Sequence, residues 1–195
     1  MGYDDSDRWD GPEGSAPAAV KFLIAGGFGV GKTTMVAAVS EVEPLRTEEY
    51  LTVASVGVDD VAGVADKDTT TVAMDFGRIT VSPELVVYLF GTPGQERFWF
   101  MWDDLVLGAL GAVVIADTRR LRASFGSIDF FENRGIPFVV SVNCFDGYQD
   151  RTVAEIREAL DLDPRVPILM GDLRQRSVSR DVLLKLVDHL MDGRD

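Results

Sequence analysis

The sequence predicts an α/β fold in which a mostly parallel sheet carries helices on both faces. Short, continuous apolar runs recur along the chain, as expected for strands that are buried on both faces. Segments with helical periodicity separate these runs, and this alternation indicates βαβ units. A third observation is the tight turn at Ser82-Pro83, which joins two neighbouring strands as an antiparallel hairpin. We therefore expect a six-stranded sheet, mostly parallel, with one antiparallel edge strand.

The elements follow one another in a regular order. Strands are expected at 20–27, 71–81, 85–90, 111–117, 137–143 and 165–170. Helices are expected at 32–42, 97–110, 120–135, 152–160 and 177–192. In a sheet of this kind ligands bind at the carboxyl ends of the strands, so the loops that follow the strands are the expected place for chemistry.

The bulk properties limit the class of protein. The 195 residues have the length of one domain, assigned to 20–195, whereas 1–19 is acidic, rich in Gly, Pro and Ser, and typical of a flexible tail. The formal charge of −13 argues against nucleic acid or an anionic membrane as a partner, because both would repel the chain. The single cysteine, Cys144, excludes an intramolecular disulfide, and no apolar run is long enough for direct membrane insertion. We therefore expect a cytoplasmic protein.

A glycine-rich stretch, GGFGVGKTT, directly follows the first expected strand and precedes a helix. It fits the pattern G-x-x-x-x-G-K-[ST] of a phosphate loop, which predicts the P-loop NTPase fold. Backbone N–H groups must point at phosphate oxygens there, and glycine reaches the required φ values without penalty. Lys32 adds a positive charge at the β and γ phosphates, and Thr33 offers a hydroxyl to Mg²⁺. The alternative is a glycine-rich turn that matches the pattern by chance. The expected nucleotide-binding residues are Gly26, Gly27, Phe28, Gly29, Val30, Gly31, Lys32, Thr33 and Thr34.

A second segment, NCFD at 143–146, follows a buried strand and resembles the N-K-x-D guanine motif of the Ras-like small GTPases. The carboxylate of Asp146 can accept hydrogen bonds from N1 and N2 of guanine, a donor pair that adenine does not offer. The resemblance implies that Asn143 ties this loop to the phosphate loop, and that Leu173 in the later GDLR segment donates its N–H to guanine O6. Cys144 stands where the family has a lysine whose stem covers the base. The alternative is an ordinary turn, since Asn and Asp favour turns.

The segment TTTVAMDFG at 69–77 resembles the T-I-G-x-[DE]-F sequence of switch I in the same family. This resemblance implies that Thr71 completes the Mg²⁺ shell and senses the γ-phosphate. Thr69 and Thr70 are competing registers. Threonine is also common in strands, so a purely structural role is the alternative.

The segment GTPGQERF at 91–98 resembles D-T-A-G-Q-E-R-F of switch II in six of eight places. The resemblance implies that Gly94 donates its N–H to the γ-phosphate and that Gln95 is the catalytic residue that orients the attacking water. The alternative for Gln95 is an exposed residue in the first turn of a helix.

Gly91 stands where the family has the switch II aspartate, which usually touches Mg²⁺ through a water. The loss of such an outer contact typically costs about 10- to 100-fold in metal affinity or activity. We therefore expect Thr33 and Thr71 to hold Mg²⁺ loosely, together with the phosphates. Asp117, at the end of a neighbouring strand, is another possible carboxylate, although an Asp there is also typical of a turn.

Two longer segments, LFGTPGQERFWFMWDD and GAVVIADTRRL, carry a narrower resemblance. They resemble the Roadblock-associated bacterial Ras-like GTPases encoded in actinobacterial conservons, the CvnD-like proteins. That resemblance implies a partner with a Roadblock/LC7 fold. It also implies a link to a membrane sensor-kinase-like protein, through which the chain would be recruited to the membrane.

The expected helix at 97–110 is rich in aromatic residues. Trp99 and Phe100 point away from its core face, so they are either covered by a neighbouring helix or contact a partner. The core face, at helical spacing, consists of Phe98, Met101, Trp102 and Leu105.

Taken together, these segments predict a Ras-like GTPase that cycles between GTP and GDP forms with Mg²⁺ and switches a protein partner. Intrinsic hydrolysis is expected to be slow because the chain shows no evident arginine finger. The basic run of Arg119, Arg120 and Arg122 is interpreted as a solvated helix face, with a kinase-like lid as the alternative. Two other functions stay open: a GTP-binding scaffold with little or no hydrolysis, and a small-molecule P-loop kinase.

Overall fold

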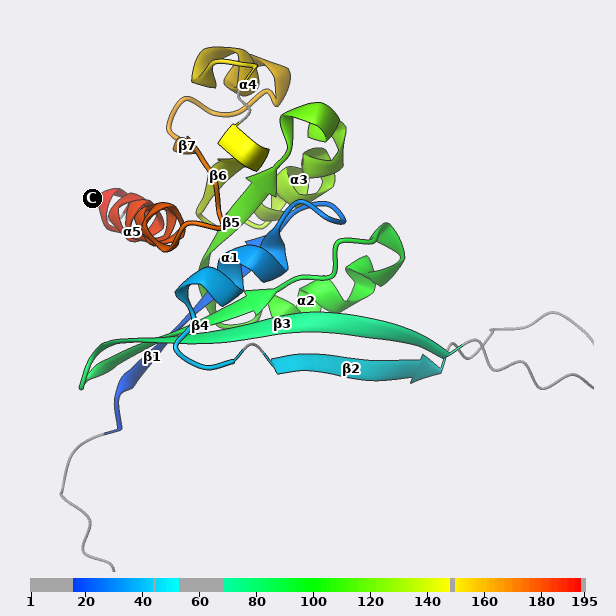
Figure 1. Cartoon of the computed structure of the whole chain (residues 1–195), viewed down its shortest axis with the longest axis vertical. Helices are drawn as coiled ribbons and strands as arrows, with labels where there is room; N and C mark the ends of the chain where they lie inside the picture. Colours follow the sequence, from blue (N-terminus) through cyan, green and yellow to red (C-terminus); the bar gives the residue numbers. More distant parts are fainter. Residues whose placement is uncertain (1–15, 44, 53–68, 148–149, 194–195) are drawn as a thin grey trace, which may run out of the picture.

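The protein is built on one seven-stranded sheet with helices on both faces (Figure 1). The computed structural model describes residues 16–43, 45–52, 69–147 and 150–193. The strand order is β2-β3-β4-β1-β5-β6-β7. The strands are β1 (Ala18–Ala25), β2 (Leu45–Thr52), β3 (Thr69–Ser82), β4 (Leu85–Gly91), β5 (Ala109–Ala116), β6 (Phe138–Asn143) and β7 (Ile168–Gly171). The helices are α1 (Lys32–Val39), α2 (Trp102–Leu105), α3 (Phe125–Asn133), α4 (Val153–Ala159) and α5 (Arg176–Asp192), with 3₁₀ turns η1 (Glu96–Met101), η2 (Thr118–Ser124) and η3 (Phe145–Gly147).

The P-loop NTPase fold is confirmed, but the predicted number of strands is wrong by one. The additional strand is β2, which pairs antiparallel with β3 at the edge of the sheet. Its sequence, LRTEEYLT, has no continuous apolar run, because an edge strand can remain polar. Strand β3 is therefore antiparallel to both of its neighbours, β2 and β4, and is not at the edge as predicted. All other neighbouring strands pair in parallel.

Alternate residues of the central strands enter two separate cores, as expected for a sheet that is covered on both faces. Phe22 and Ile24 of β1 pack with buried residues of α1 and α5. Leu23 and Ala25 of the same strand pack with buried residues of α2, α3 and α4 on the other face. The strand begins at Ala18, two residues before the predicted boundary at 19/20, and most of the predicted tail lies outside the described residues.

Three predicted helices differ from the structure by three or more residues, and the first of them, predicted at 32–42, ends at Val39. The expected helix at 97–110 is a 3₁₀ turn followed by the short α2, and Gly108, with φ of 73°, separates it from β5. A left-handed φ cannot continue a right-handed helix, so this glycine ends the segment. The expected helix at 120–135 begins as the 3₁₀ turn η2, in which Arg120 departs from helical geometry. By contrast, α4 starts as predicted, with a capping box between Thr152 and Glu155.

The aromatic segment before β5 packs largely as predicted. Phe98 and Trp102 are buried, and Trp102 stacks against the aromatic rings of α3. The ring of Trp99 lies against Gly126 of α3, so closely that any side chain at position 126 would collide with the ring. Phe100 is 63% exposed, so of the two residues directed away from the core it is the more accessible.

Within the described part of the chain, no helix combines the length and the apolar character that crossing a membrane requires.

Candidate nucleotide site

The candidate site lies where five parallel strands end at the same edge of the sheet. Strands β4, β1, β5, β6 and β7 run in the same direction, so the loops that follow them meet there (Figure 1). This is the edge at which open α/β sheets bind ligands. The predicted phosphate loop, switch II and guanine loop all belong to this group of loops.

The phosphate loop adopts a backbone that requires glycine at its two ends. Gly26 has φ of 133°, and a Cβ there would lie 2.4 Å from the carbonyl oxygen of Ile115. Gly31 has φ of 112° and is the residue immediately before α1; a Cβ there would lie 2.6 Å from Nδ2 of Asn143. Between them, Phe28 is 68% exposed, whereas Val30 is buried. The loop is therefore fixed by contacts with β5 and β6, and the amino end of α1 faces the site.

Lys32 folds back over the loop from the start of α1. Its Nζ donates hydrogen bonds to the carbonyl oxygens of Gly26, at 2.9 Å, and Gly27, at 2.8 Å. Burial lowers the pKa of Lys32 to about 8, partly offset by the negative charge of Asp75. Gly94 of the switch II loop lies directly against this ammonium group, since a Cβ on Gly94 would be 2.6 Å from Nζ. Lys32, the phosphate loop and switch II thus enclose one small region.

The carboxylate beside Thr33 comes from Asp75 of β3. Thr33 Oγ1 donates a 2.7 Å hydrogen bond to Asp75 Oδ2, and Asp75 is only 8% exposed. A Cβ on Gly91 would lie 2.9 Å from the Cβ of Asp75 and 3.0 Å from its Oδ2. Asp75 therefore occupies the space into which an aspartate at position 91 would project. A carboxylate of the neighbouring strand thus lies where the resemblance places one on position 91.

Asp75 was not predicted as a site residue, although it lies in the segment that resembles switch I. The strand register is what places Asp75 in the site. In the antiparallel pair of β3 and β4, Phe76 lies opposite Phe90, so the next position along each strand puts Asp75 beside Gly91. Asp117, the predicted alternative carboxylate, is engaged instead by Arg119 and Arg120.

Thr71, the predicted Mg²⁺ ligand of switch I, lies within β3, where it pairs with Tyr50 of β2. Thr71 comes four residues before Asp75 in the extended strand, which is about 13 Å. The segment that resembles switch I is thus a paired strand rather than a loop. The role of Thr71 as a Mg²⁺ ligand stays a prediction.

The switch II loop after β4 carries the predicted catalytic residue. Gln95 is partly exposed and precedes η1, with extended φ and ψ of −97° and 133°. Pro93, two residues earlier, accepts a hydrogen bond from the indole of Trp102. Gln95 thus directly follows Gly94, which lies against Lys32, and comes two residues after the carbonyl group that is bonded to Trp102.

Asn143 joins three of the loops, and the resemblance to the guanine motif implies only its bond to the phosphate loop. Its Nδ2 donates to the carbonyl oxygen of Val30 in the phosphate loop at 3.0 Å. Its Oδ1 accepts from the backbone N–H of Leu173 in the loop after β7 at 3.3 Å. The prediction that the Leu173 N–H is available for guanine O6 differs from this structure, because that N–H already donates to Asn143. The Leu173 side chain is buried in the core.

Asp146, in the guanine-like loop after β6, has a left-handed backbone, at φ of 55°. Its carboxylate is 85% exposed and accepts from Arg174 Nη2 at 2.9 Å, while the same arginine contacts Asp172 at 2.7 Å. Asp146 therefore has a cationic partner that the motif does not indicate, and its contact with guanine stays a prediction.

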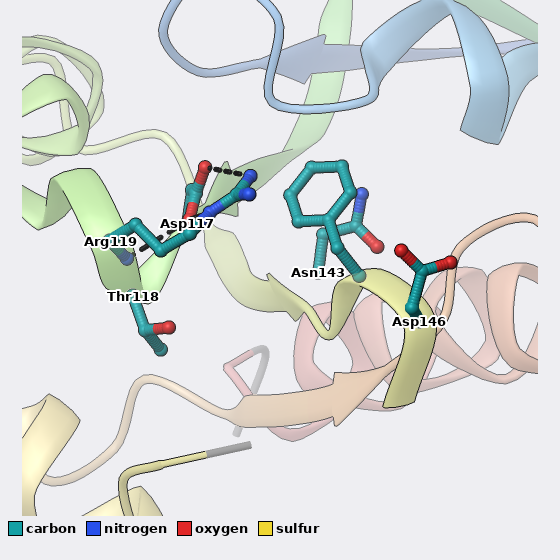
Figure 2. A pocket seen from close by; sticks show the side chains of 6 residues that line it. Asp117, Thr118, Arg119, Asn143 and Asp146 are labelled. Carbon is teal, nitrogen blue, oxygen red and sulfur yellow. Dashed lines mark hydrogen bonds and ion pairs between the residues drawn. The ribbon is translucent and has the colours of Figure 1, made fainter. Parts of the chain in front are cut away.

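A pocket of about 230 Å³, which we term the base pocket, lies between the loops after β5 and β6 (Figure 2). Asp117 and Arg119 form one side of it and Asp146 the other, with Asn143 between them (Figure 2). Arg119 lies over the ring of Phe145 at 4.3 Å, a cation–π contact. Cys144 is buried and directed at the Val142 carbonyl oxygen, so it does not cover the pocket as the family's lysine does. Arg119 and Phe145 line the pocket, and sequence spacing gave no signal for either.

Solved structures share this fold. The G domain of the T. maritima FeoB iron transporter matches with a TM-score of 0.57 and 17% identity, covering 91% of this chain and 100% of that one. The cytosolic domain of the same transporter in a GDP form matches with a TM-score of 0.63 and 15% identity, covering 91% of this chain. The present chain spans 66% of that cytosolic domain, just under two thirds. At these identities the likeness shows the fold alone, which is that of a G domain.

Sequence comparison indicates a family. An uncharacterized protein of Methanocaldococcus jannaschii, MJ1339, is 30% identical over 129 residues, which are 65% of this chain and 71% of that protein. The family model described as "Conserved hypothetical ATP binding protein" matches residues 24–193. The match includes the phosphate loop, both switch segments and the guanine-like loop. The chain is a P-loop nucleotide-binding protein that belongs to this family of conserved hypothetical ATP binding proteins.

Proposed function

We propose that the protein binds GTP and GDP with Mg²⁺ and acts as a Ras-like switch with slow intrinsic hydrolysis. The observation that carries this proposal is the pair of bonds made by Asn143, which fixes the base loop to the phosphate loop and to the loop after β7. A base next to Asp146 and phosphates next to Lys32 then belong to one continuous site.

The preference for guanine rests on Asp146. Its exposed carboxylate can accept two hydrogen bonds, and N1 and N2 of guanine form the matching donor pair. The test is Asp146→Asn, since the amide can donate to O2 of xanthine where the carboxylate accepts from N2 of guanine. We expect the variant to lose at least tenfold in GTP affinity and to gain affinity for XTP. Equal GTP affinity in the variant and the parent would contradict a guanine contact at Asp146.

Thr33 and Asp75 fit a Mg²⁺ site. Mg²⁺ prefers oxygen ligands, keeps several waters, and is usually held by one or two carboxylates together with substrate phosphates. The hydroxyl of Thr33 and the carboxylate of Asp75 are such oxygens, and they are in contact. Across the described residues, no three acidic, His or Cys side chains gather closely enough to bind a metal alone. The nucleotide phosphates would therefore supply part of the coordination.

Hydrolysis depends on Gln95, which is partly exposed beside Gly94. We expect Gln95→Leu to slow the single-turnover hydrolysis of bound GTP about tenfold or more without weakening GTP binding. If the parent protein binds GTP but releases no phosphate over hours, the alternative of a GTP-binding scaffold replaces the switch.

A second candidate is ATP binding, which two observations favour. The family is described as ATP binding, and Arg174 already neutralises the carboxylate that would select guanine. Competition between GTP and ATP for the same site distinguishes the two nucleotides.

The partner we propose is a Roadblock/LC7-type protein, supported by sequence resemblance. Phe100 is the most accessible aromatic residue next to switch II and would belong to the contact surface. Phe100→Ala should weaken binding to such a partner at least tenfold while GTP affinity stays within twofold. Retained partner binding in this variant would contradict a contact at Phe100. The link to a membrane sensor-kinase-like protein is part of the same proposal.

A further inference from the structure

The basic run after β5 is exposed, as interpreted from the sequence, but two of its arginines also contact a buried carboxylate. Arg119 and Arg120 follow Asp117, whose carboxylate is 1% exposed and contacts both of them. Arg119 is held by two side-chain bonds, Nε to Oδ1 at 2.9 Å and Nη2 to Oδ2 at 2.8 Å, which is a bidentate geometry. Arg120 lies 3.6 Å from Oδ2 and so makes only a loose ion pair.

The two arginines extend to opposite ends of the candidate site. Arg119 lies over Phe145 in the base pocket. Arg120 has φ and ψ of −146° and 46°, which turns it out of the helical path of η2. Its Nη2 donates to the carbonyl oxygen of Phe28 at 3.3 Å and lies 3.7 Å from where a Cβ on Gly29 would be. Arg120 therefore rests on the phosphate loop.

The contacts of Arg120 leave most of its hydrogen-bonding capacity available. The guanidinium has five N–H donors, and Nη2 makes both the bond to Phe28 and the loose ion pair with Asp117. The side chain is 54% exposed, so it can change rotamer without disturbing the core. The adjacent loop is the one whose backbone N–H groups cradle nucleotide phosphates.

We propose that Arg120 binds phosphate oxygens of the nucleotide, as an arginine that the chain supplies to its own site. This inference rests on the proposed nucleotide-binding function and deepens it. The guanidinium leaves the Phe28 carbonyl oxygen and donates to the anionic phosphates, which are stronger acceptors. Asp117 keeps Arg119 at the base end, so one buried carboxylate positions cationic groups at both ends of the site.

The test compares three variants of the full chain for their affinity toward a non-hydrolysable GTP analogue. Arg120→Gln keeps a donor for the Phe28 carbonyl but removes the charge, and we expect it to weaken binding about 10- to 100-fold. Arg120→Lys keeps the charge and should retain affinity within about fivefold. Arg122→Gln removes one charge from the same run and should change affinity less than twofold. Thermal unfolding of each variant checks that the fold is intact.

The possible outcomes separate this inference from the function on which it rests. If Arg120→Gln binds the analogue as tightly as Arg122→Gln does, the contact with Phe28 is structural and Arg120 has no phosphate role. If the parent protein binds neither GTP nor ATP analogues, the proposed function is wrong, and the inference is wrong with it.

Discussion

The phosphate end and the base end of the site are built from different kinds of contact. At the phosphate end, the backbone of the phosphate loop packs closely on the sheet, as Gly26 does on β5. The side chains there, such as Lys32 and Asp75, are partly or largely buried. At the base end, the carboxylate expected to select the base, that of Asp146, is exposed and paired with Arg174. Buried contacts are screened little by water, whereas exposed pairs are worth little. The phosphate end should therefore dominate affinity, and the base end should adjust selectivity.

The largest effect should come from Lys32→Ala at the phosphate end. The ammonium group is positioned for two phosphates, and charge-assisted hydrogen bonds are roughly twice as strong as neutral ones. We expect GTP affinity to fall about 100-fold or more, measured by displacement of a fluorescent nucleotide. Lys185→Ala removes an exposed lysine of α5 and should change affinity less than twofold. A loss of GTP affinity below threefold in Lys32→Ala would contradict the claim that the phosphate end dominates affinity.

The next effect tests the carboxylate that β3 supplies. Asp75→Asn should lower apparent Mg²⁺ affinity about 10- to 100-fold, measured by metal titration at a fixed GTP concentration. The matched control is Asp188→Asn, an exposed aspartate of α5. Gly91→Asp alone should destabilise the fold, because its side chain meets Asp75.

Exchanging the residues at positions 75 and 91 tests the same carboxylate without a steric clash. The double variant Asp75→Gly with Gly91→Asp moves the carboxylate from β3 to β4 without the clash. We expect it to recover both thermal stability and metal dependence relative to Gly91→Asp. A double variant that is less stable than Gly91→Asp would contradict an exchange of the two positions.

The pH dependence of binding tests the buried ammonium group. The pKa of Lys32 is lowered to about 8, so the free protein loses this charge as the pH rises through that value. Phosphates favour the charged form, so binding must take up a proton above pH 8. We expect GTP affinity to fall up to about tenfold between pH 8 and 9, measured by titration calorimetry in buffers of different ionisation enthalpy. The unliganded fold should instead gain stability from pH 8 to about 10, since the unfolded chain there binds more protons. Absence of proton uptake at pH 8.5 would contradict this account of Lys32.

The smallest effect should come from Arg174→Ala at the base end. The ion pair with Asp146 is exposed, and such pairs contribute about 0–1 kcal/mol. Freeing the carboxylate should raise GTP affinity by up to about threefold and increase discrimination against ATP. Arg180→Ala, which breaks another exposed pair, is the control. A tenfold loss of GTP affinity in Arg174→Ala would show that this arginine contacts the nucleotide itself.

The contrast between the two ends also explains how much the sequence could predict. Glycines, Lys32 and Thr33 occur at a fixed local spacing, because one short loop supplies every contact, so their arrangement was predictable. The fold was predictable for the same reason, since apolar runs mark buried strands. Strand β2 was not predicted because its pairing depends on β3 and leaves no apolar pattern.

The site residues that were not predicted are positioned by contacts between strands or between loops. Asp75 replaces the carboxylate absent at Gly91 only because two antiparallel strands share a register. Arg174 reaches Asp146 from a segment 28 residues away. Arg120 reaches the phosphate loop across 92 residues. These contacts cannot be predicted from the spacing of residues along the chain, because they depend on where the fold places the ends of the strands.

The most direct test of a guanine-nucleotide site is a titration of the full chain with a fluorescent GTP analogue, with and without Mg²⁺, in competition with GDP and ATP. We expect binding that requires Mg²⁺, that GDP displaces, and that ATP displaces at least 100-fold less well. Equal displacement by ATP and GDP, or binding that is indifferent to removal of Mg²⁺, would contradict this expectation.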